Sequence, residues 1–122
     1  MTMDDIRRIR LSAECLDRPI TVEAHVFVEG GVHVSVYGGD RPHIGAISVA
    51  HPDGRVMTTQ FPGHRDAAVS EAWGKAIAAL GFAPVVIEAG IHYDGLSREG
   101  IQSVLMLSDR LLSDLLTALR RR

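Results

Sequence analysis

Residues 20–38, "ITVEAHVFVEGGVHVSVYG", alternate between apolar and polar side chains on both sides of two glycines. A period of two places successive side chains on opposite faces of an extended chain, so each half predicts a half-buried β-strand. The glycine pair between the halves predicts the turn of an antiparallel hairpin. The fold is therefore expected to contain an antiparallel sheet with one apolar face.

The register of this hairpin follows from the need to keep like faces together. A three-residue loop, Glu29 to Gly31, pairs Val28 with Val32. The same loop pairs Val26 with Val34, so that the apolar sides match. A glycine then supplies the left-handed residue of the loop.

The remaining elements are predicted from periodicity, turn residues and helix caps. They are strands at Ile6–Leu16, Ile44–Ala50, Arg55–Phe61 and within residues 83–95, a helix at Asp66–Leu80 and a last helix that Ser97 caps. Residues 44–50 are apolar on both faces. We expect them to form the central third strand of a meander that continues the hairpin.

Strands followed by helix, strand and helix predict an α+β fold, with a mainly antiparallel five- to six-stranded sheet and two helices packed on one face. The chain of 122 residues is expected to form a single domain, 1–122. Hydrophobic residues make up 46% and charged residues 23% of it, which is ordinary for a globular protein.

Charge and hydropathy narrow the classes of partner. The net charge is −2, which argues against nucleic acid. Cys15 is the single cysteine, so no internal disulfide can form, and we expect it to be a small core residue. No apolar run is typical of a signal peptide or long enough to span a bilayer, so we expect a cytoplasmic protein without membrane association.

Residues 38–45, "GGDRPHIG", hold ionisable side chains between glycines. Glycine amides and an arginine are groups that bind phosphate, and Pro42 stiffens the segment before His43. A hairpin turn with a surface ion pair between Asp40 and Arg41 would account for the same residues.

Two further loops place a histidine beside a glycine. In "PGHRD", residues 62–66, His64 and Arg65 precede a helix whose first amides attract anions. An ordinary helix start, capped by Asp66, is the alternative. In "GIHYDG", residues 90–95, His92 and Asp94 point the same way along an extended segment. This pair can bind a metal, act as base and partner, contact a ligand or be purely structural.

A metal site and a hydrolytic site both lack support in the sequence. The candidate metal ligands are His43, His64 and His92, but no two histidines lie three or four apart on a helix and none has a partner cysteine. No serine stands in a nucleophile elbow. We therefore expect neither a metal nor catalytic residues.

The motifs "VYGGDRPHIGAISVA", "FPGHRD" and "AGIHYDGLSREGI" resemble, in order and spacing, those of the LpdD-like family of prenylated-flavin chaperones. The resemblance runs from about Ile20 to the last helix. Members of this family are also described as a small accessory component of gallate decarboxylase. The resemblance implies a non-catalytic homodimer that binds prenylated FMN and helps deliver or mature it for a UbiD-type aromatic acid (de)carboxylase. A flavin prenyltransferase is a second candidate partner.

The positions that match the family motifs are the candidate cofactor-binding residues. They are Gly38, Gly39, Asp40, Arg41, Pro42, His43, Gly45, Gly63, His64, His92 and Asp94. We expect Arg41 and the amides of residues 38–39 to face the flavin phosphate. His43 and His64 are expected to line the pocket, and the pair in the third loop to make polar contacts.

Two other functions would use the same residues. The first is a small accessory enzyme subunit in which a metal ion or the histidines assist proton transfer. The second is an interaction subunit whose motifs only contact the decarboxylase. Bound colour and phosphorus after purification would distinguish the carrier from both, and a tightly bound transition metal would favour the enzyme.

Overall fold

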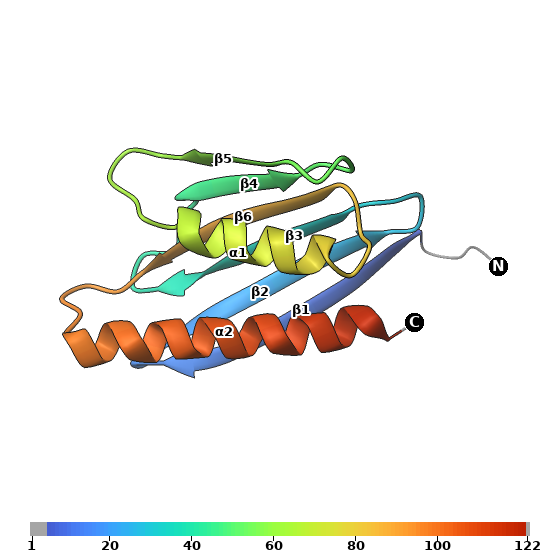
Figure 1. The fold of residues 1–122 in the computed structure, drawn as a ribbon. Coiled ribbons are helices and arrows are strands. Elements are labelled where there is room, and N and C mark those ends of the chain that lie inside the picture. The colour runs from blue at the N-terminus through green and yellow to red at the C-terminus, as the bar shows by residue number, and fades with distance from the viewer. Residues whose placement is uncertain (1–4, 122) are drawn as a thin grey trace.

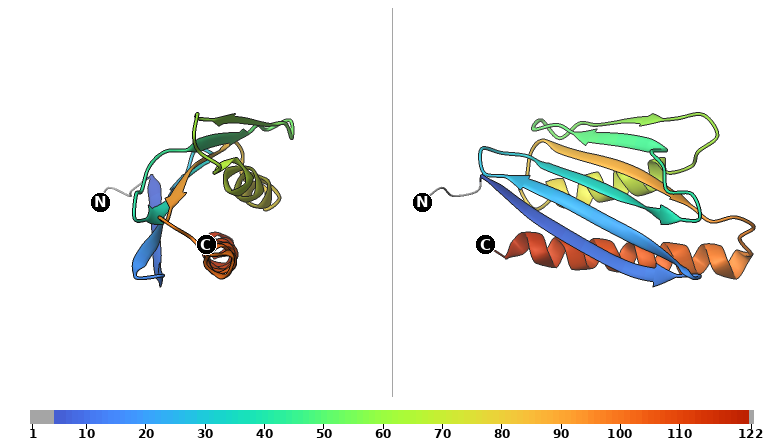
Figure 2. Two further views of the ribbon diagram at one scale, coloured as in Figure 1. Left: turned by 90° about the vertical axis from the view of Figure 1, so that its left-hand side faces the viewer. Right: turned by 180° about the vertical axis from the view of Figure 1, so that it is seen from behind.

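A computed structural model describes residues 5–121 of the chain. Its elements in chain order are β1 (Ile6–Cys15), β2 (Arg18–Phe27), β3 (Val32–Gly39), β4 (Ala46–Ala50), β5 (Val56–Gln60), α1 (Ala67–Ala78), β6 (Val85–His92) and α2 (Arg98–Arg120), as Figure 1 shows. The strands form one sheet in the order β1-β2-β3-β6-β4-β5, in which β3 and β6 run parallel and the other neighbours antiparallel. Both helices cover the same face of the sheet (Figure 2). The predicted α+β class and layer order are confirmed.

The predicted meander is wrong at its third strand. β4 pairs with β6 and β5, and β6 lies between β4 and β3. A parallel pair such as β3 and β6 needs a long crossover connection, and residues 40–84, which include α1, provide it. The expectation that residues 44–50 form an interior strand is confirmed, but their neighbours are set by a strand that comes later in the chain.

The hairpin register is shifted by two residues from the prediction. Val26 pairs with Val32, and Val28 lies in the loop. The Phe27 amide donates to the carbonyl of Gly31 at 3.0 Å, while the Val28 amide donates outward to the carbonyl of Asp5, also at 3.0 Å. Because the shift is an even number, the apolar faces still match. The loop glycines have positive φ, as expected, at 126° for Gly30 and 99° for Gly31.

The core lies between the apolar face of the sheet and the two helices. Its buried members include Ile20, Val22, Ala24, Val32, Val34 and Val36 from β2 and β3, Ala50 from β4, Val85, Ile87 and Ala89 from β6, Trp73 and Ile77 from α1, and Leu111, Leu115 and Leu119 from α2. Burial of each large side chain contributes about 1.5–3 kcal/mol. Cys15 is buried among them, as predicted.

A buried polar chain fixes α1 on the sheet. The hydroxyl of Ser48 in β4 lies 2.7 Å from that of Ser70 in α1 and 2.7 Å from that of Thr58 in β5. Burying a hydroxyl without a hydrogen-bond partner costs free energy. These hydroxyl–hydroxyl contacts therefore favour the observed position of α1 relative to β4 and β5.

The long helix α2 begins as predicted, because the Ser97 hydroxyl accepts a hydrogen bond of 3.0 Å from the Gly100 amide. None of the helices in residues 5–121 combines the length and hydropathy needed to cross a membrane.

Gly90→Ala should lower the free energy of unfolding by about 1–3 kcal/mol or more, because a Cβ on Gly90 would collide with the carbonyl of His43. Gly74→Ala, inside α1, should raise it by about 0.5–1 kcal/mol, since the nearest atom to its new Cβ is a side-chain carbon of Ile87 at 3.6 Å. Urea denaturation of both variants measures the difference. Equal stabilities would contradict the close approach at Gly90.

Candidate functional site

The segment between β3 and β4 crosses the end of β6. Residues 40–45 leave β3, pass over the last residues of β6 and join β4 on its other side. The amides of Asp40 and Arg41 both donate to the carbonyl of His92, at 2.7 and 3.3 Å. This segment is therefore held to β6 by its backbone, and its side chains are carried to the carboxyl end of that strand.

Gly38 and Gly39 lie in β3 and are buried. A Cβ on Gly38 would collide with the carbonyl of Pro19, and one on Gly39, whose φ is +84°, with the carbonyl of His92. Close packing in the sheet thus accounts for both glycines without a ligand.

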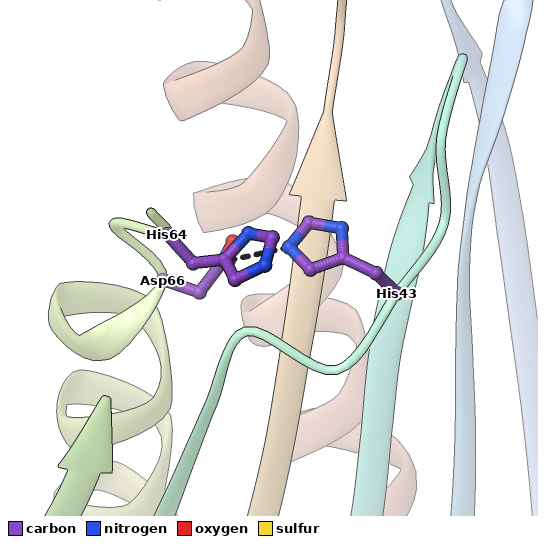
Figure 3. Close-up of side chains that lie close together, drawn as sticks. All are labelled: His43, His64 and Asp66. Carbon is purple, nitrogen blue, oxygen red and sulfur yellow. Dashed lines mark hydrogen bonds and ion pairs between the residues drawn. The ribbon is translucent and has the colours of Figure 1, made fainter. Parts of the chain in front are cut away.

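Three side chains from two loops meet beside the end of β6. The Nε2 atom of His43 lies 3.0 Å from Oδ2 of Asp66, and the ring of His64 stacks on that of His43 with centroids 4.1 Å apart (Figure 3). His92 approaches His43 edge-on at 6.5 Å. The three histidine loops, far apart in the sequence, therefore converge on one site.

Asp66 is a site residue that sequence reasoning treated only as a helix cap. It occupies the N-cap position of α1, but its side chain makes no capping hydrogen bond. Its Oδ1 atom instead accepts a hydrogen bond of 3.0 Å from the Ile91 amide, and the residue is 7% exposed. Gly45 makes room for it, since a Cβ there would collide with the carboxylate. The signal in the sequence was the His-x-Asp spacing that "HRD" shares with "HYD" in the third loop.

A cleft of about 270 Å³ opens over this cluster. It is lined by His43, Gly63, His64, Arg65, Asp66, Ile91 and His92. A second hollow of about 320 Å³ lies on the other side of the His43 segment. It is lined by Glu23, Ser35, Val36, Tyr37, Pro42, His43, Ile44 and Glu88. Of the residues predicted for the site, Gly63, His64, His92 and His43 line the first cleft, and Pro42 lines only the second.

The ion pair between Asp40 and Arg41, the alternative explanation of this loop, is not formed. Arg41 pairs with Asp94 at 3.3 Å, and Asp40 pairs with Arg18 at 3.2 Å. Asp94 also lies 3.0 Å from Nε2 of His92, so the predicted contact between these two residues is present. Asp40, Arg41 and Asp94 form an exposed rim beside the cleft, and His92, which pairs with Asp94 of this rim, also lines the cleft.

Asp40 ties the third loop to this rim. Its Oδ2 atom accepts a hydrogen bond of 3.0 Å from the Asp94 amide. This bond, followed by the pairing with Arg18 and the charge of His92, lowers the pKa of the Asp40 carboxyl below its ordinary value. The carboxylate is therefore charged at neutral pH and holds two loops together.

Tyr93 belongs to the same loop but is not a candidate acid or base. Its side chain is buried, and its hydroxyl donates to the carbonyl of Arg18 at 3.0 Å. Burial, followed by interaction with Cys15 and the charge of Asp40, raises the pKa of Tyr93 to about 12. The phenol stays protonated at neutral pH and anchors the loop to the start of β2.

Comparison with known proteins decides the family. The sequence model of a protein family, the prenylated flavin chaperone LpdD-like domain, matches residues 16–120. The chain belongs to the LpdD-like family. The match includes all three histidine loops of this LpdD-like domain, and it confirms the resemblance found in the sequence motifs.

The fold of the LpdD-like chain is shared with a solved chaperone. A chain from the crystal structure of a chaperone complex for yeast 20S proteasome assembly superposes with a TM-score of 0.61 at 12% identity. The match covers 93% of the LpdD-like chain and 98% of the yeast chain. At this identity the likeness shows the fold alone. A search of curated proteins found no match.

Asp40→Asn should remove a contribution to stability that depends on pH. The carboxyl has an ordinary pKa of 3.8 when unfolded and a lower pKa when folded, so its contribution to stability is present above the ordinary value and is lost as the pH falls through the folded value. Urea denaturation at about pH 6 should show the variant less stable than the wild type, and at about pH 3 the gap should shrink. A gap of the same size at both pH values would show that the charge is not its source.

Proposed function

We propose that this chain is a carrier for prenylated FMN that binds its cargo in the cleft over His43, His64 and His92. The observation that carries the proposal is the convergence of the three family motifs on one cleft, in a chain that belongs to a prenylated-flavin chaperone family. The carrier delivers the flavin to a UbiD-type (de)carboxylase in the cytoplasm, or assists its maturation there, and does not itself decarboxylate.

The flavin phosphate is assigned first to Arg65. Arg65 lines the cleft, and its side chain has no hydrogen bond or ion pair with any residue in 5–121. It stands next to the start of α1, whose first amides and dipole favour an anion. Arg41 is the second cation, but it must leave Asp94 before it can bind phosphate, so its net contribution is smaller.

The ring system is assigned to the histidines. Stacked imidazoles offer both a flat face and hydrogen-bonding nitrogens, which suits an isoalloxazine with polar edges. In this proposal His92 and Asp94 contact the cargo from the rim. Gly38, Gly39 and Gly45 contribute through the close packing that places these side chains, and Gly63 and Pro42 contribute to the walls.

The cleft favours a site completed by a second copy. Ligand pockets are commonly about 300–1,000 Å³, and the cleft of one chain lies just below that range. The outer face of the sheet carries Phe27, 40% exposed, together with Tyr37. We therefore propose a homodimer formed through this outer face, and a decarboxylase that approaches the cargo from the open side.

A second candidate function has one observation in its favour. The imidazole of His64 stacks on that of His43 and makes no hydrogen bond or ion pair within residues 5–121, so one of its nitrogens can accept a proton from a ligand in the cleft. An accessory enzyme would change the flavin by proton transfer. The absorption spectrum and mass of prenylated FMN, recorded before and after incubation with the chain alone, separate the two, because a carrier returns its cargo unchanged.

Arg65→Ala should weaken binding of prenylated FMN by about 1.5–3 kcal/mol, the range for a hydrogen bond to a charged group. Arg41→Ala should weaken it less, because the exposed pair with Asp94 offsets up to about 1 kcal/mol. Anaerobic calorimetric titration of the reduced and oxidised flavin measures both. Arg55→Ala is the matched control, since Arg55 forms a similar exposed pair with Asp53 in the turn between β4 and β5.

Three results would bear against parts of this assignment. A larger loss in Arg41→Ala than in Arg65→Ala would move the phosphate to the rim. Equal losses in all three variants, control included, would point to a general effect of charge. A wild-type chain that binds neither form of the flavin would refute the carrier function.

Light scattering of the wild-type chain at micromolar concentration should give the mass of a dimer. Phe27→Asp should shift it to a monomer, because a carboxylate on the outer face has no partner when that face is covered. Met106→Asp is the control, since Met106 is 73% exposed on α2, on the opposite side of the sheet. A wild-type monomer, or a dimer that tolerates Phe27→Asp, would contradict the proposed surface.

A further inference from the structure

Both ring nitrogens of His43 face oxygen atoms that can accept a hydrogen bond. Its Nδ1 atom lies 2.9 Å from the carbonyl of Arg41, which can only accept, so Nδ1 carries a hydrogen. In the neutral ring Nε2 then has a lone pair, and it faces the Oδ2 atom of Asp66 at 3.0 Å. Two lone pairs at this distance repel, so either a proton shared by the two groups or a metal ion must lie between or beside them.

Both groups are oriented from behind, as ligands in metal sites are. The Arg41 carbonyl fixes the ring of His43, and the Ile91 amide holds the other oxygen of Asp66. In metal sites, such hydrogen bonds to the far side of a ligand fix the tautomer of a histidine and orient the lone pair that binds the metal. The side chains of His43 and Asp66 are 19% and 9% exposed, so water screens the pair little.

His64 offers a third metal ligand. A proton shared by His43 and Asp66 would not need this residue. Its ring makes no hydrogen bond or ion pair within residues 5–121, yet it stacks on His43. One ligand atom from each of His43, His64 and Asp66 can be chosen so that all three lie within 4.8 Å of one another. Ligands of a tetrahedral site with bonds of about 2.1 Å lie about 3.4 Å apart, so the ligand atoms that are furthest apart would have to close from at most 4.8 Å to about that separation.

We propose that His43, His64 and Asp66 bind one divalent transition-metal ion, with the remaining coordination position open to the cleft. Two imidazoles and one carboxylate suit Zn²⁺, Co²⁺ and Fe²⁺ rather than Mg²⁺ or Ca²⁺, which prefer oxygen ligands. The open position takes water when no other ligand is present. The inference rests on the geometry of these three side chains and does not require the proposed flavin function.

The test is a titration of chelator-treated protein with Co²⁺, followed by visible absorption and calorimetry. Wild type should bind about one Co²⁺ per chain with the intense visible bands of a low-coordinate ion, and Zn²⁺ should displace it. His64→Ala should fold normally, because its ring makes no hydrogen bond with the described residues. It should lose more than about 10-fold in affinity, since loss of a ligand costs at least as much as loss of an outer contact.

Asp66→Asn should show the same loss, while its amide oxygen can still accept from Ile91. Two histidine variants serve as controls: His51→Ala, from the turn between β4 and β5, and His92→Ala, from the neighbouring loop, should both bind Co²⁺ like wild type. Circular dichroism checks the fold of each variant.

The proposal is overturned if wild type binds no Co²⁺, which would leave a shared proton between His43 and Asp66 as the account of their contact. It is also overturned if His64→Ala and His51→Ala bind equally, or if His92→Ala loses as much affinity as His64→Ala. Titration of the metal-free chain with prenylated FMN tests the carrier function separately. The two ideas can therefore fail independently.

Discussion

The backbone hydrogen bonds between residues 40–45 and the end of β6 are the interactions on which the rest of the site depends. They carry the chain from β3 to β4 across an intervening strand, where a tight turn cannot reach. The same bonds draw His43 over Gly90, where a side chain on the glycine would be excluded. Once this crossing is made, the carboxylate of Asp66 at the start of α1 contacts the ring of His43 and accepts a hydrogen bond from the amide of Ile91 in β6.

The site joins a rigid interior to an exposed rim. His43 and Asp66 are largely buried and each is held by a backbone group, so their positions are set by the fold. Arg41, Asp94 and His92 are about half exposed or more and hold one another through pairs that water screens. The proposed carrier function would benefit from this division, because the buried part keeps the geometry of the site while the rim can exchange ion-pair partners when a ligand binds.

Local patterns in the sequence predicted most of the elements and the three loops of the site, but not the order of the strands. The alternation around the glycine pair identified the hairpin, yet its register was off by two because the Val28 amide bonds to Asp5, outside the hairpin. The position of β6 has no local signature, since nothing in the sequence of an interior strand specifies which two strands pair with its edges. Asp66 was missed because an aspartate before a helix is expected to cap it, and only the three-dimensional structure shows the Ile91 amide competing for its carboxylate.

The place of β6 in the sheet also sets the order in which the molecule can be assembled. β1, β2 and β3 pair with neighbours in the chain, as do β4 and β5, so these two units close short loops. β6 follows both units in the chain and lies between them in the sheet. Its pairing with β3 joins residues that are far apart in the sequence, and such contacts form slowly during folding. Without the residues from Val85 onward, the chain lacks both the strand that lies between β3 and β4 and the histidine loop that follows this strand. In the proposed carrier, the cleft for the cargo can therefore form only after β6 has joined the two groups of strands.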